Sequence, residues 1–258
     1  MPKLGIGGFL VLLVLSFIFK KDFFALLGGA GGPSAGTTQS APANLSPEEE
    51  KMTQFVSFVL DDVQGTWEKI FASQGQTYRH ARLVLFNDTV RSGCGYAETA
   101  MGPFYCPADE KVYIDLGFYR ELQERFGAPG DFAQAYVIAH EFGHHVQNQL
   151  GVSGKVERLQ QQDPRRANEL SVRLELQADC LAGVWAHSTS QRDLLQAGDV
   201  EEAMTAASAV GDDRIQQQAT GRVNPETWTH GSAAQRAQWF NTGLESGDLQ
   251  RCDTFAAR

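Results

Sequence analysis

The pentapeptide His140-Glu141-Phe142-Gly143-His144 constrains this chain more than any other feature of its sequence. Residues four apart on a helix project from the same face, so both histidines can direct their imidazoles at one metal ion. Glu141 follows the first histidine and can reach a metal-bound water as a general base. The run 131–139 contains no helix breaker, and Gly151 ends the segment. We therefore predict a helix that carries part of a zinc site, the alternative being ordinary surface histidines.

A catalytic zinc site needs a third protein ligand. The longer pattern H-E-x-x-H-x-x-G-x-x-H is excluded, because Gln147 and Leu150 stand where it needs the glycine and the third histidine. Glu175 is the better candidate. It lies on a second predicted helix, which opens near Pro164 and runs to about His187.

Glu175 and Asp179 are four residues apart and share one face of this second helix. One carboxylate can ligate zinc while the other accepts the free N–H of a ligand histidine and fixes its tautomer. The alternative is a solvated acidic face with Arg173 as a neighbour. Should Glu175 not be the ligand, Asp179 or Glu169 is the next candidate. Two histidines, one glutamate and an open position predict one catalytic Zn²⁺ per chain.

Two longer segments carry a resemblance to known proteins: HEFGHHVQNQLG at 140–151 and ELQADCLAGVWA at 175–186. Over residues 44–258 the chain resembles the bacterial neutral zinc metallopeptidase family of single-pass membrane proteins. Its E-x-x-x-D element also resembles that of membrane metalloproteases that process prenylated or damaged membrane proteins. The resemblance implies zinc on His140, His144 and Glu175, Glu141 as catalytic base, and Asp179 as the partner of a ligand.

A later segment, 229–236, resembles the H-P-x-x-x-x-R element of those membrane proteases, with Gly231 in place of the proline. The resemblance implies that His230 or Arg236 donates to the oxyanion of the tetrahedral intermediate. The alternative for His230 is a surface or core histidine without a catalytic role.

The N-terminus has the composition of a membrane segment. Residues 4–19 are uncharged and apolar, but they make a helix of only about 24 Å against a hydrocarbon core of roughly 30 Å. With Lys20 and Lys21 snorkelling, 4–27 can span the bilayer. We expect an uncleaved anchor at 1–27 rather than a signal peptide, and a flexible linker at 28–43.

The remaining residues, 44–258, predict an α+β domain of the zincin type, a small β-sheet packed on a mainly helical body. Ser46 and Glu49 form a capping box at the start of its first helix. Strands are predicted at 81–86, as a buried strand, and at 111–115. Helices dominate after Gly117, and two of them, 200–210 and 233–244, follow the site helices.

The strand 111–115 is also the predicted edge along which an extended peptide binds, because Val112 and Ile114 alternate with Tyr113. An interior strand paired on both sides is the alternative. In that case the segment 102–105 is the next place for the peptide.

Four cysteines allow three complete pairings. Cys94 and Cys106 bracket one loop and are the favoured pair, which leaves Cys180 and Cys252 to tie the second site helix to the C-terminus. Such bonds suit an oxidising compartment, so we expect the domain outside the cytoplasm of a bacterial cell. Four reduced thiols are the alternative.

The net charge of −9, with no cluster of basic residues, gives no electrostatic basis for nucleic-acid binding. We therefore expect a single-pass, membrane-anchored zinc metallopeptidase. Its partners would be the lipid bilayer and a peptide or protein substrate, with hydrolysis by a zinc-activated water and Glu141 as base. The alternative is a membrane-tethered binding or scaffold protein whose zinc site is structural or vestigial.

Overall fold

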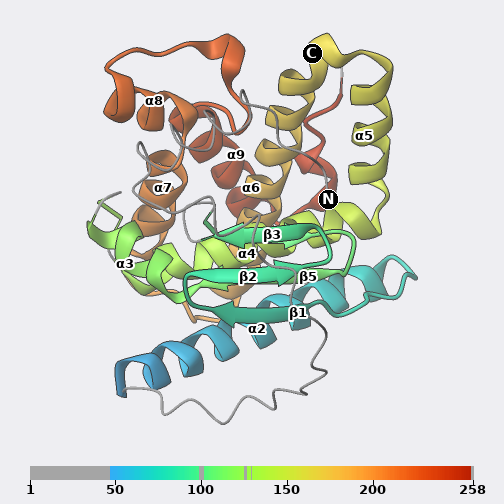
Figure 1. Ribbon diagram of the computed structural model, residues 1–258. Helices are drawn as coiled ribbons and strands as arrows, with labels where there is room; N and C mark the ends of the chain where they lie inside the picture. The colour runs from blue at the N-terminus through green and yellow to red at the C-terminus, as the bar shows by residue number, and fades with distance from the viewer. Residues whose placement is uncertain (1–46, 99–101, 125–126, 129, 257–258) are drawn as a thin grey trace, which may run out of the picture. The chain divides into compact units, whose positions relative to one another are not determined.

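A computed structural model of the chain describes residues 47–98, 102–124, 127–128 and 130–256 (Figure 1). This part is mostly helical with a small sheet, so the α+β class is confirmed. The predicted anchor, the linker and the Ser46 cap lie outside the described residues. Among the described helices, none combines the length and apolar character needed to cross a bilayer. The longer helices are α2 Pro47–Ser73, α4 Asp131–Gln149, α5 Val152–Gln162, α6 Ala167–Gln191, α7 Asp199–Ala209 and α9 Ala233–Ser246.

The sheet has the strand order β1-β5-β4. Strand β5, Lys111–Asp115, pairs in parallel with β1, Arg82–Phe86, and antiparallel with β4, Phe104–Cys106. The strands β2, Thr89–Ser92, and β3, Gly95–Glu98, form a separate antiparallel pair.

Two predictions about strands are corrected by this topology. The segment 111–115 is the central strand and not an edge, because β5 pairs with β1 on one side and with β4 on the other. The predicted buried strand at 81–86 is instead β1 on the other edge, where only Phe86 is buried.

Helix α4 occupies the centre of the domain. It contacts α2, α5, α6 and α7 as well as β4 and β5, and lies between α2 on one side and α6 and α7 on the other (Figure 1). Fourteen of its 19 residues are buried. The apolar face of α2 packs on this core through Val56, Val59, Val63 and Trp67.

Two disulfides join distant parts of the domain, and both predicted pairs are confirmed. Cys94 bonds to Cys106 at the end of β4. Cys180 on α6 bonds to Cys252 in the 3-10 turn Leu249–Cys252, with the two Cα atoms 5.5 Å apart. The second bond fixes the C-terminal segment against the helix that carries Glu175.

Helices α6 and α9 pack with their backbones in close contact. Gly183 lies against the Phe240 carbonyl, and Gly243 lies against the Cys180 carbonyl, so neither position has room for a Cβ atom. This close crossing brings the first turn of α9, with Arg236, onto α6 at Asp179.

Candidate metal centre

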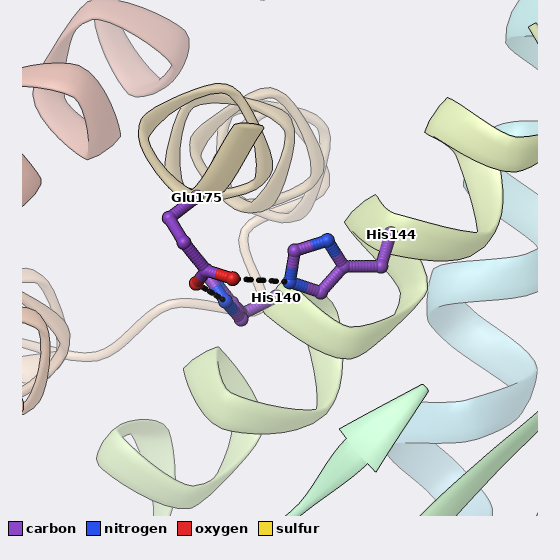
Figure 2. Close-up of side chains that lie close together, drawn as sticks. All are labelled: His140, His144 and Glu175. Atoms are coloured by element: carbon purple, nitrogen blue, oxygen red, sulfur yellow. Dashed lines mark hydrogen bonds and ion pairs between the residues drawn. The ribbon is translucent and has the colours of Figure 1, made fainter. Parts of the chain in front are cut away.

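The structure brings together the three predicted ligands, as Figure 2 shows. His140 and His144 project from α4, and Glu175 projects from α6. Glu175 lies with one carboxylate oxygen 3.2 Å from His140 Nε2 and the other 3.4 Å from His144 Nε2. One ligand atom from each residue lies within 4.8 Å of the others. The alternative ligand Glu169 pairs with Arg166 and takes no part in this cluster.

Gly143 explains why the two helices can share one site. A Cβ atom at this position would lie 2.9 Å from the Ala178 carbonyl oxygen and 3.1 Å from its Cα on α6. The missing side chain therefore allows α4 and α6 to pack with their backbones close together. This spacing lets the short reach of Glu175 bridge both histidines.

Both candidate ligand histidines have a buried acceptor at Nδ1, which leaves Nε2 available to a metal ion. His140 Nδ1 lies 2.9 Å from Asp179 Oδ1, as the sequence predicted. His144 Nδ1 lies 2.9 Å from Gln147 Oε1. Such acceptors fix the ring orientation and tautomer of metal ligands. Sequence reasoning missed Gln147, although its position three residues after His144, on the same helix face, was a usable signal.

Gln147 also joins the two site helices. It is fully buried, and its Nε2 donates to the Leu174 carbonyl at 2.7 Å and to Gln177 Oε1 at 3.0 Å. Gln177 in turn donates to the Cys252 carbonyl. A continuous hydrogen-bonded path therefore links His144 to the C-terminal segment.

Arg236 has a set of acceptors of its own. Its Nε and Nη2 donate to the two oxygens of Asp179, each at 2.9 Å, and Nη2 also donates to Tyr136 Oη. Nη1 donates to the Val210 carbonyl. Arg236 and Asp179 are both buried, so this bidentate pair fixes the carboxylate that holds His140.

The electrostatics of the cluster favour a bound cation. Burial opposes protonation of His140, but Asp179 and Glu175 outweigh it and raise its pKa to about 10. Burial alone would raise the pKa of Glu175, yet the charges of His144 and His140 hold it well below its usual range. Two imidazole nitrogens and one carboxylate suit Zn²⁺, whereas Mg²⁺ and Ca²⁺ prefer oxygen ligands. The donor set therefore fits zinc.

Glu141 lies in the wall of a cleft of about 650 Å³ that also contains the three ligands. The residue is only 7% exposed. Unlike the other acidic groups of the site, its carboxylate has no hydrogen-bond or ion-pair partner among the described residues. A nearly buried carboxylate beside a metal site is costly unless water or substrate solvates it.

His230 lies in the same cleft, before the start of α9. Its Nδ1 is 3.2 Å from Asp212 Oδ1, and this hydrogen bond raises the pKa of the imidazole. Asp212 also accepts from the backbone N–H groups of Thr229, His230 and Gly231, which fixes the loop. Sequence reasoning missed Asp212, since nothing in its local sequence points to a partner in that loop.

Comparison with known proteins agrees with this geometry. Residues 2–255 match the model of a family described as "Putative neutral zinc metallopeptidase", and the chain belongs to this family. It is 48% identical over 254 residues to the uncharacterized protein YpfJ of Escherichia coli (strain K12), covering 97% of this chain and 87% of that protein. It is 49% identical over 208 residues to the uncharacterized protein Rv2575 of Mycobacterium tuberculosis, covering 76% and 68% respectively. No solved structure matches.

Proposed function

We propose that this chain is a zinc-dependent peptidase in which His140, His144 and Glu175 hold the metal and Glu141 is the general base. One observation carries the proposal: the Glu141 carboxylate is nearly buried, has no hydrogen-bond or ion-pair partner among the described residues, and lines the cleft beside the three proposed ligands. A structural zinc site has no use for such a group, whereas a hydrolase needs a carboxylate free to contact water.

Glu141 carries out both proton transfers of the proposed reaction. Zinc, when bound, supplies a Lewis acid that polarises the scissile carbonyl and acidifies the attacking water. Glu141 takes a proton from that water as its oxygen bonds to the carbonyl carbon. Glu141 then returns the proton to the amine nitrogen as the C–N bond breaks.

His230 is the proposed donor to the oxyanion that forms during attack. Asp212 occupies Nδ1, which leaves Nε2 as the nitrogen available to a substrate in the cleft. The Asp212 contact favours the protonated ring, which is the better donor. We assign Arg236 to a different task from the predicted oxyanion support, because its contacts with Asp179 make it the anchor of that carboxylate.

The substrate is proposed to be an extended peptide that lies along 102–105. This segment contains the start of β4, which is one of the two edge strands of the sheet among the described residues, and it lines the cleft together with the proposed metal ligands. Strand addition at an open edge provides main-chain hydrogen bonds without demanding a particular sequence.

The membrane location is likewise a proposal. The apolar segment 4–27 would anchor the protein in a bacterial membrane, with 28–43 as linker and 44–258 as an extracytoplasmic domain. The two disulfides support an oxidising compartment.

Metal-dependent hydrolysis tests the proposed function. Full-length protein stripped with a chelator should not cleave an unfolded protein substrate, and one equivalent of zinc per chain should restore cleavage. Glu175→Ala should need far more zinc, and His144→Ala should lose the metal. A zinc-loaded wild type that cleaves no peptide bond in any unfolded substrate contradicts the proposal.

A further inference from the structure

His145 directly follows the second metal ligand, but the proposed chemistry does not use it. It lies on α4 about 100° around the helix from His144, and it is fully buried. Its Nε2 is 2.6 Å from the Arg79 carbonyl oxygen, and its Nδ1 is 3.0 Å from the Tyr105 hydroxyl. The ring therefore connects α4 to two other parts of the chain.

These contacts define the direction of the hydrogen bonds. A carbonyl oxygen can only accept, so His145 Nε2 carries the hydrogen and Nδ1 of the neutral ring accepts from the Tyr105 hydroxyl. Asn148 Nδ2 donates to the same hydroxyl oxygen at 3.0 Å. The Tyr105 hydroxyl thus has both a donor and an acceptor on α4, which holds its aromatic ring in one place.

Tyr105 belongs to the segment 102–105 that lines the cleft. Its strand β4 is also held by pairing with β5 and by the disulfide at Cys106. One helix, α4, therefore carries the two histidine ligands and also the two side chains, His145 and Asn148, that position this wall. The distance from wall to metal is set within a single rigid element, which favours accurate placement of a substrate.

The cleft beside this wall is largely apolar. Apart from the three ligands and Glu141, the charged groups among its described lining residues are Glu121, His230 and Arg236, and Arg236 is already paired with Asp179. A charged substrate side chain entering here would lose water with little compensation. Its apolar lining includes Phe104, Tyr105, Phe118, Val137, Val210 and Ile215.

We propose that the cleft selects extended peptide segments with a large apolar side chain next to the scissile bond, and that the Tyr105 ring, held by His145 and Asn148, contacts that side chain. The position of this side chain next to a scissile bond rests on the proposed peptidase function. The apolar preference itself rests on the cleft and can be tested without hydrolysis.

Peptide binding to the zinc-loaded, full-length Glu141→Gln protein is the first test. The probes are fluorescent decapeptides that differ at one central position, which is Leu, Phe, Ser or Asp. We expect the Leu and Phe peptides to bind at least about tenfold more tightly than the Ser and Asp peptides, in line with the discrimination of apolar pockets. Equal affinities, or no binding by any probe, overturn the inference.

Substitutions at Tyr105 form the second test. Tyr105→Ala should reduce the preference for apolar over polar probes to about threefold or less, while zinc affinity stays within about threefold of wild type. Tyr105→Phe keeps the ring and should keep the preference, with weaker binding because the ring is no longer held. The control is Tyr113→Phe on the neighbouring strand β5. It removes a hydroxyl bonded to Asp109, in the turn between β4 and β5, and should change neither quantity.

The two proposals can fail separately. Apolar-selective binding without hydrolysis by the wild type refutes the peptidase and leaves the apolar cleft. Hydrolysis with no preference beside the cut bond, measured by mass spectrometry on a peptide library, refutes the selectivity and leaves the peptidase. Tyr105→Ala with an unchanged preference refutes the role of the tyrosine.

Discussion

Adding one methyl group at Gly143 should disturb both stability and metal binding. In Gly143→Ala the new Cβ would lie 2.9 Å from the Ala178 carbonyl oxygen and 3.3 Å from the Ala178 Cβ. The closest atom belongs to helix backbone and cannot rotate away. Relief therefore requires that α4 and α6 move apart, and this movement carries Glu175 away from His140 and His144.

The magnitude is best obtained by comparison with Gly65→Ala. Gly65 lies inside α2, and a Cβ there would meet nothing within 4 Å. Alanine gains about 1 kcal/mol over glycine in a helix interior, and this gain is common to both variants. Overpacking costs about 1–3 kcal/mol, so Gly143→Ala should be less stable than Gly65→Ala by about that amount.

Urea unfolding of the zinc-free full-length variants measures the stability difference, and competition with a chelator measures zinc affinity. We expect Gly65→Ala to be at least as stable as wild type and to bind zinc equally well. Gly143→Ala should be less stable and bind zinc about tenfold more weakly, by analogy with loss of a group that positions a ligand. The reasoning is refuted if the two variants have the same stability and the same zinc affinity.

Three further outcomes follow from other contacts. Burial opposes ionisation of Asp62, but hydrogen bonds from Arg192 and Trp185 outweigh it and lower its pKa. Asp62→Asn should therefore lower the free energy of unfolding by about 2 kcal/mol at pH 7. This difference from wild type should shrink as pH falls below about 4, and urea titrations at several pH values measure it. Gln147→Met, which removes the acceptor for His144 Nδ1, should weaken zinc binding about tenfold in the same chelator competition. Protein denatured without reductant, taken from its native host, should contain no free thiol, since all four cysteines are paired; four free thiols would contradict both disulfides.

The sequence predicted the parts of the site that depend on helix periodicity. His140 and His144 share a face because they are four residues apart, and the same spacing relates Glu175 to Asp179. The two predicted site helices are present, although α6 begins at Ala167 after a 3-10 turn and extends to Gln191.

Contacts between segments that are distant in the sequence could not be predicted from local sequence patterns. Tyr105 and His145 are 40 positions apart, and their meeting depends on the order of strands in the sheet. The same strand order makes 111–115 the central strand. Alternation of apolar residues in the sequence cannot distinguish an edge strand from a central one. Gly143 likewise gave no local signal that a neighbouring helix would pass so close.

The most direct test of the account is a paired measurement on wild type and Glu141→Gln. Both proteins are reconstituted with zinc, and zinc per chain and the rate of peptide hydrolysis are measured on the same samples. We predict one zinc per chain in both, with hydrolysis reduced by at least about a hundredfold in Glu141→Gln, the lower end of the usual contribution of a general base. Loss of zinc from Glu141→Gln would show that Glu141 is a metal ligand. An undiminished rate of hydrolysis would show that Glu141 is not the general base. Either result contradicts the proposed mechanism.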